Sequence, residues 1–216
     1  GPGQQESGIH IDTAGEFETW LDGLGANTRL KAFNRRRYLR QKGTPAHVIA
    51  ENDGEHALDI LNAFHLERWG KPCFEGASLE FHRRFLKRLS GRILPLFTRL
   101  EIEGRTLSIL YDVKVADCIY NIQAGFDEQF DNKVSLGTLH LGYAIEHAFA
   151  QHDVRRYDLL AGSGKRTFYK ARLNGTEVVF GTSQHLRARW IRHAWKAQAW
   201  APRAATRAAV KWLERA

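Results

Sequence analysis

The sequence predicts an α+β fold in which a mixed β-sheet is flanked by helices. Up to residue 91, apolar side chains recur mostly at helical spacing. Between residues 92 and 124 the period changes to two, which is typical of an antiparallel meander. A loop, a helix and another strand follow, and this order places the next strand parallel to the last strand of the meander.

The first half of the chain carries most of the predicted helices. Residues 17–21 and 27–40 are predicted to be helical, and Gly43 and Pro45 end this run. Residues 47–50 are predicted to form a short strand. Two further helices follow, one capped at Asn52 or Asp53 with Leu58, Leu61, His65 and Trp69 on one face, and one from Ser78 to Gly91 that stacks Phe81, Phe85 and Leu89.

The second half carries the predicted sheet. Alternation is cleanest from Leu107 to Val115, where every second residue is apolar. The predicted strands are 92–102, 105–115, 118–124, 155–160 and 177–180, and the predicted helical segments are 136–151, a short turn at 168–172, and the chain after residue 185.

Composition excludes several classes of protein. The chain has 216 residues, of which 43% are hydrophobic and 26% charged, so it can bury a core and is not predicted to be disordered. No uncharged run is as long as a membrane span. Cys73 and Cys118 lie far apart among apolar residues, which favours a reducing compartment. These features predict a cytoplasmic protein, or one peripheral to the inner face of the membrane.

We expect three segments along the chain. Residues 1–8 are predicted to be a tag remnant and a disordered start, because Gly1-Pro2-Gly3 is typical of a protease-cleavage scar. Residues 9–184 are predicted to form the domain. Residues 185–216 are predicted to form a basic, Ala/Arg/Trp-rich helical extension.

The formal charge of +8 is unevenly distributed. Residues 29–42 and 187–215 each carry a local charge of +7, so the remainder is acidic at −6. Such segments attract an anionic partner such as RNA, phospholipid or a phosphorylated substrate. The alternative is that both segments are solvated helix faces without a partner.

The start of the predicted helix 136–151 is a candidate anion site. A helix N-terminus presents unpaired N–H groups and the positive end of its dipole. Ser135 can cap this end, Gly137 allows close approach to the backbone, and Lys133 adds positive charge. The alternative is an ordinary capped helix start.

An ordered series of motifs surrounds this helix. It comprises 120–127 (YNIQAGFD), 135–137 (SLG), Glu146, 157–160 (YDLL), Gly162 and the pair Tyr169-Lys170. Across residues 25–175 the chain resembles the GNAT acyltransferase superfamily, in the CelD-like branch linked to cellulose and exopolysaccharide biosynthesis and related to FemAB-type peptidyltransferases. Leu136 stands where that branch usually has proline, and Leu159 where it often has phenylalanine.

The resemblance implies a GNAT-like fold and a donor site. Such proteins hold acyl-CoA or acetyl-CoA with the pyrophosphate at the N-terminus of the helix that follows the fourth strand. The thioester then lies where two strands diverge, here between residues 120–125 and 157–160. The donor-binding residues implied in this sequence are Gln123, Gly125, Lys133, Ser135, Leu136, Gly137 and Thr138.

The resemblance also implies catalytic roles. An amine attacks the thioester directly. The protein therefore holds the two reactants in position and supplies a base, and an acid for the leaving thiolate. Tyr169 is the candidate acid and Lys170 the candidate partner of a phosphate. Asp158 and Glu146 are candidate bases, and each has a structural alternative, which for Asp158 is to hold a loop. No metal site is predicted, because the histidines of the 136–151 helix lack a third ligand at zinc spacing.

Three functions remain open from sequence. The first is transfer of an acyl group from acyl-CoA to an unknown amine or sugar-linked acceptor, in exopolysaccharide or cell-envelope biosynthesis. The second uses aminoacyl-tRNA as the donor, which the basic segments favour. The third is a binding module that has kept the fold without the chemistry.

Overall fold

A computed structural model describes residues 5–161 and 170–181. In this part of the chain seven strands form one sheet with the order β2-β3-β4-β5-β6-β1-β7. The strands are β1 Gln5–Asp12, β2 Ala46–Glu51, β3 Ile93–Ile102, β4 Arg105–Val115, β5 Cys118–Phe126, β6 Arg156–Ala161 and β7 Thr176–Gly181. The helices are α1 Phe17–Asp22, α2 Ala26–Arg29, the π-helix η1 Leu30–Asn34, α3 Arg35–Gln41, α4 Gly54–Trp69, α5 Gly76–Arg88 and α6 Leu136–Ala150.

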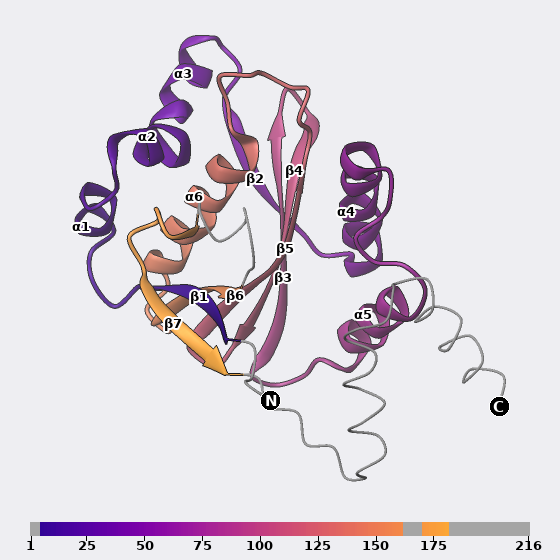
Figure 1. The fold of residues 1–216 in the computed structure, drawn as a ribbon. Coiled ribbons are helices and arrows are strands. Elements are labelled where there is room, and N and C mark those ends of the chain that lie inside the picture. The colour runs from indigo at the N-terminus through magenta and orange to yellow at the C-terminus, as the bar shows by residue number, and fades with distance from the viewer. Residues whose placement is uncertain (1–4, 162–169, 182–216) are drawn as a thin grey trace, which may run out of the picture. The chain divides into compact units, whose positions relative to one another are not determined.

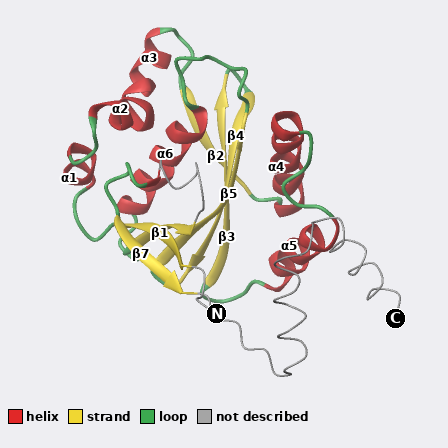
Figure 2. Cartoon of the chain, in the orientation of Figure 1, coloured by secondary structure: helices red, strands yellow, loops and turns green. Residues whose placement is uncertain are grey.

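Helices cover both faces of the sheet. Helices α1, α2, α3 and α6 lie on one face, and α4 and α5 lie on the other (Figures 1 and 2). The central strand β4 is buried on both sides, from Leu107 to Lys114 without interruption. One cluster of buried apolar side chains fills the space under α4, and two others fill the space under α6.

The mixed pairing of the sheet confirms the predicted fold class. Strands β2, β3, β4 and β5 pair antiparallel in sequence, and β5 pairs with β6 in parallel. The crossover between β5 and β6 runs through α6, as the order of elements predicted. The hairpin turn between β3 and β4 places Glu103 and Gly104 at positive φ, and the Asp53 carboxylate caps α4 by accepting from two backbone N–H groups.

The start of the domain differs from the expectation. Residues 1–8 were predicted to be a tag remnant and disordered, yet β1 begins at Gln5 and pairs antiparallel with β6. The reason is the alternation of Ile9 and Ile11, whose side chains are buried against β6. The predicted extension at 185–216 lies outside the described residues.

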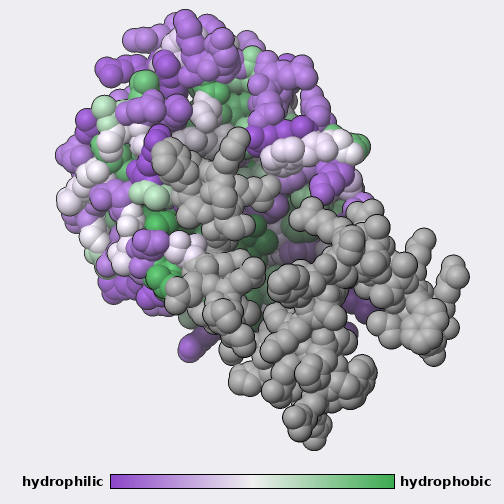
Figure 3. Space-filling model, in the orientation of Figure 1, coloured by the Kyte–Doolittle hydropathy of each residue, from purple (hydrophilic) through white to green (hydrophobic). Residues whose placement is uncertain are grey.

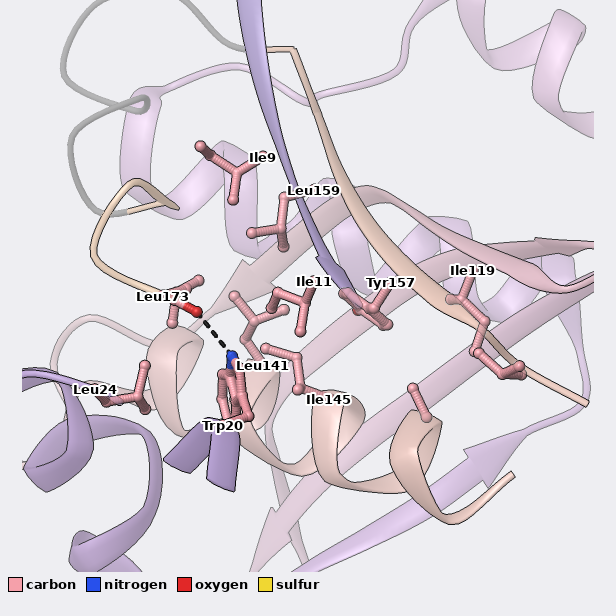
Figure 4. Close-up of a cluster of buried hydrophobic side chains, with 12 residues drawn as sticks. Ile9, Ile11, Trp20, Leu24, Ile119, Leu141, Ile145, Tyr157, Leu159 and Leu173 are labelled. Atoms are coloured by element: carbon pink, nitrogen blue, oxygen red, sulfur yellow. Dashed lines mark hydrogen bonds between the residues drawn. The ribbon is translucent and has the colours of Figure 1, made fainter. Parts of the chain in front are cut away.

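A cluster on the α6 face ties the two ends of the described chain together. Ile11 from β1, Ile145 from α6 and Leu159 from β6 point toward one another in this cluster (Figure 4). The Trp20 indole N–H donates to the carbonyl oxygen of Leu173 at 2.9 Å, shown as a dashed line in Figure 4. The segment that leads to β7 is therefore anchored on α1.

Candidate active site

Strands β5 and β6 form a fork. They pair in parallel at three positions, of which the last joins Tyr120 to Asp158. Beyond this pair β5 continues along β4 to Phe126, whereas β6 continues along β1 to Ala161. Among the described residues, no strand pairs with the β6-facing edge of β5 from Asn121 onward.

Strand β6 is the second strand of the fork, and it contains a bulge near its end. Leu160 has a φ of 58°, and the register between β6 and β1 shifts at this level. The Leu160 N–H donates to Asp158 Oδ1 at 2.7 Å. The Lys170 ammonium donates to the carbonyl oxygens of Leu159 and Leu160. Two predicted catalytic residues, Asp158 and Lys170, thus hold the backbone of this bulge.

The N-terminus of α6 lies beside the end of β5. An ideal Cβ on Gly137 would come 2.7 Å from a ring carbon of Phe126, so glycine permits this close packing. The Ser135 hydroxyl lies 3.0 Å from that of Thr138 and makes no cap hydrogen bond to the backbone. Because the first N–H groups of a helix have no intrahelical acceptor, the first turn of α6 keeps donors suited to an anion.

Two cationic residues lie near this helix start. The Arg68 guanidinium, from the end of α4, lies 4.7 Å from the centre of the Phe126 ring. Lys133 is exposed two residues before Ser135. Sequence reasoning missed Arg68, because nothing in the local pattern of α4 shows that its last turn reaches the end of β5.

The loop between β5 and α6 is also acidic, which opposes anion binding unless its carboxylates are paired. Each of the three carboxylates has a cationic partner: Asp127 with Arg105 at 3.9 Å, Glu128 with Arg68 at 2.6 Å and Asp131 with Lys42 at 3.1 Å. The backbone N–H of Lys133 also bonds to Asp131 and is the main cause of the lowered pKa of that carboxyl. The loop charge is therefore largely neutralised.

Three predicted donor-binding residues make contacts within the fold itself. Gln123 Oε1 accepts from the Ala124 N–H at 3.1 Å. An ideal Cβ on Gly125 would lie 3.1 Å from Cβ of Phe64, so this glycine allows α4 to approach β5. The Leu136 side chain is buried in the core, which leaves its backbone N–H as the group that faces a ligand at the helix start.

A sequence model of the GNAT acetyltransferase domain matches residues 26–171, which is more than half of the chain. The chain belongs to the GNAT acetyltransferase family. This confirms the family resemblance, and the forked sheet with α6 at its open end is the structure that carries it. A search of curated proteins found none that matches this GNAT domain.

Solved structures with the same fold are distant in sequence. FemX superposes with a TM-score of 0.57 at 11% identity, covering 80% of this chain and 59% of FemX. L-PGS from Bacillus licheniformis gives 0.52 at 13% identity, covering 86% and 63%. The C-terminal domain of a protein assigned as a lysylphosphatidylglycerol synthetase from Agrobacterium fabrum gives 0.53 at 9%, covering 82% and 60%. This GNAT domain spans about three fifths of each structure's length.

Glu146 does not join the other predicted residues at the fork. Its carboxylate pairs with the Arg36 guanidinium, which stacks on the rings of Phe33 and Tyr143 at 4.3 and 3.5 Å. The Arg36 side chain is 9% exposed, so this arginine of the basic segment 29–42 does not lie on a solvated helix face. The exposed surface over α3 is hydrophilic (Figure 3).

A chain of hydrogen-bonded polar side chains that ends on β5 was not predicted from the sequence. His140 Nε2 lies 3.1 Å from the Thr98 hydroxyl, His140 Nδ1 lies 3.0 Å from the Ser108 hydroxyl, and that hydroxyl donates to the Gly125 carbonyl at 3.0 Å. Since Ser108 uses its proton on Gly125, His140 is assigned as the Nδ1–H tautomer, with Nε2 accepting from Thr98. Burial lowers the pKa of His140 to about 3, which keeps it neutral.

A second missed group lies where the fork opens. Asp112 on β4 accepts from Asn121 Nδ2 at 2.7 Å and from the Tyr157 hydroxyl at 2.9 Å. Burial raises the pKa of Asp112 to about 7, although both hydrogen bonds oppose the rise. The Asp112 carboxylate thus links β4, β5 and β6 beside the last parallel pair, Tyr120 with Asp158, before β5 and β6 diverge. A polar residue within a buried strand was the available signal.

Tyr169, the candidate acid, lies outside the described residues. Within the ranges 5–161 and 170–181, no three His, Cys, Asp or Glu side chains are grouped as metal ligands require. In the same ranges no helix is both long and apolar enough to span a membrane. Cys73 and Cys118 are not joined, and burial raises the pKa of the Cys73 thiol to about 11.

Proposed function

We propose that this GNAT domain transfers an acyl group from acyl-CoA to an amine or a sugar-linked acceptor. The fork is the observation that carries the proposal, because no strand of the described residues pairs with this edge of β5 from Asn121 onward, and α6 begins beside the end of that edge. A thioester donor with amides along its arm and a pyrophosphate at one end fits such a site. Amides add to a strand edge, and a pyrophosphate binds a helix N-terminus.

The chain's own groups then have separate tasks. The edge of β5 orients the thioester carbonyl, whose oxygen gains charge as the amine attacks. The first-turn N–H groups of α6, with Arg68 and Lys133, hold the pyrophosphate. As the amine adds, it loses a proton to a base; the carbon–sulfur bond then breaks, and the thiolate takes a proton from an acid. Tyr169 remains the proposed acid.

A pair of variants at Thr138 tests the donor site. The change Thr138→Asp places a carboxylate in the first turn, where it stabilises the helix through its dipole but repels a pyrophosphate. Thr138→Asn has nearly the same shape without the charge. We expect CoA affinity measured by calorimetry to fall more than tenfold in the first variant and less than threefold in the second. Equal affinities in the two variants would contradict the donor site.

Gly137 is a poor position for this test. Any side chain there meets the Phe126 ring, so a loss of binding would report displaced packing as well as charge. The native protein provides the first check of the reaction itself. Release of free thiol from acetyl-CoA in the presence of an amine supports the proposal, and the absence of both thiol release and CoA binding would refute it.

A second donor, aminoacyl-tRNA, is favoured by the exposed basic residues of η1 and α3. Lys31, Arg37 and Arg40 are exposed there and have no carboxylate partner among the described residues. FemX and the lysylphosphatidylglycerol synthetases, which share the fold, motivate the same candidate. RNA affinity that falls steeply with salt, without thiol release from acetyl-CoA, would favour this donor or the binding-module function.

The biological setting rests on the resemblance alone. We propose exopolysaccharide or cell-envelope biosynthesis because the motifs resemble those of the CelD-like branch. Turnover assays with amino-sugar acceptors and with peptide amines would separate these settings, since the acceptor that gives the higher rate identifies the class.

A further inference from the structure

The two backbone polar groups of Ala124, on the open edge of β5, are each held by a side chain. The Asp127 N–H bonds to the Leu107 carbonyl on β4. Since successive residues of a strand present their backbone groups to opposite sides, those of Gly125 also face β4, as its bond from Ser108 requires. The N–H and carbonyl of Ala124 therefore face the open side of the fork.

Both of these backbone groups already have partners. The Ala124 carbonyl accepts from Nε2 of His65 at 3.0 Å. The Ala124 N–H donates to Oε1 of Gln123 at 3.1 Å. A carbonyl oxygen has a second lone pair and can accept again, whereas an N–H has one proton, so an added ligand must displace Gln123 but can keep His65.

His65 is well placed to hold this carbonyl. It is 4% exposed, it lies on α4, and its ring packs against that of Trp69 with centroids 4.6 Å apart. Helix α4 is itself seated closely on β5, because Gly125 leaves room for Phe64. Donation to a carbonyl requires the Nε2–H tautomer. The imidazole is thus fixed relative to the edge before any ligand arrives.

We propose that His65 is a positioning residue for the acyl donor. By holding the Ala124 carbonyl it fixes the peptide that joins Ala124 to Gly125. Because this peptide shares the Ala124 Cα with the preceding one, the bond also restrains the direction in which the Ala124 N–H points into the fork, toward an amide carbonyl of the donor arm. The Gln123 side chain keeps this N–H satisfied until the donor replaces it. This inference rests on the proposed function, since it assigns a residue to the donor site.

Two substitutions at His65 test the inference. His65→Gln keeps an N–H donor at a similar reach, whereas His65→Leu keeps the bulk and removes the donor. Leu58→Val on the same helix is the matched control, because Leu58 is fully buried but its apolar side chain donates no hydrogen bond to the edge. The probe is acetyl-CoA, with the dissociation constant measured by calorimetry and amide exchange measured at Ala124.

We expect His65→Leu to weaken acetyl-CoA binding at least tenfold and to speed exchange of the Ala124 amide. His65→Gln should stay within threefold of the native affinity, and Leu58→Val should match the native protein. Native affinity in His65→Leu, or equal losses in both His65 variants, would overturn this inference and leave the donor site intact. If the native chain itself binds no acetyl-CoA, the proposed function fails and this inference fails with it.

Discussion

Replacing Asp112 with asparagine should remove a pH dependence from the stability of this protein. The carboxyl group is enclosed between β4, β5 and β6, and it is 5% exposed. Burial raises its pKa from 3.8 to about 7, because the charged form loses its hydration. In Asp112→Asn the amide oxygen still accepts from Asn121, and the amide nitrogen donates to the Tyr157 hydroxyl in place of accepting from it.

The sign of the effect follows from which state holds the proton. The folded pKa of Asp112 lies above the unfolded value, so the folded state binds more protons between pH 3.8 and about 7. The stabilisation is present below about pH 4, is lost as the pH rises through this window, and stays lost above it. The rise in pKa corresponds to about 4 kcal/mol of unfolding free energy, a large part of the roughly 5–15 kcal/mol typical of a domain.

Urea unfolding at several pH values between 4 and 8.5 measures this difference. Subtracting the curve of Asp112→Asn from that of the native protein cancels all other titrating groups, including the carboxyls with lowered pKa values. We expect the variant to gain up to about 4 kcal/mol relative to the native protein across the window. Asp117→Asn, at an exposed position on the next turn, is the control and should follow the native profile.

Parallel profiles for the native protein and Asp112→Asn would refute this reasoning, because they would mean that Asp112 titrates as it does in the unfolded chain. A variant that is much less stable than the native protein at every pH would refute it as well. That result would mean that the fold requires the ionised carboxylate as a double acceptor.

Three other substitutions and one control have expected outcomes that urea unfolding can check. Arg36→Ala should cost about 1.5–3 kcal/mol, because the Arg36 guanidinium no longer bonds to Glu146 or stacks on the Tyr143 ring. Arg37→Ala, at an exposed position, should stay within about 0.5 kcal/mol, and equal effects would mean that Arg36 is not buried. Gly142→Ala should destabilise the protein and loosen α6 from η1, since its Cβ would collide with a backbone carbonyl of η1, and unchanged stability would contradict that packing. Trp20→Phe should cost about 1–3 kcal/mol by leaving the Leu173 carbonyl without its donor, and a neutral result would show that water replaces the indole.

Most of the helices and strands could be predicted because their signals are local. The two-residue period over β4 and the apolar stripe of α6 depend on neighbours along the chain, so the meander and the crossover helix lie where the pattern places them. The strand β1 was missed because the apolar alternation around Ile9 is short. Its pairing with β6 is a contact between the two ends of the domain.

The candidate site was predictable in outline and not in its contacts. The motifs at 120–127 and 135–137 correctly marked the fork and the start of α6. The ion-pair and hydrogen-bond partners of the individual side chains were not predicted. The candidate base Glu146 pairs with Arg36, which lies 110 residues earlier in the chain. Asp158 and Lys170 bond to the backbone of a bulge that no pattern predicts.

The sequence by itself determined the order of elements, the family, and the position of the helix start that we propose as the anion site, because periodicity, turn residues and ordered motifs are read along one dimension. Tertiary structure alone decided which polar groups are buried together. Asp112 meets Tyr157 across 45 residues and His65 meets Ala124 across 59. The free energy of such a pair depends on the water excluded around it, and that is a property of the packed layers rather than of either residue's neighbours in sequence.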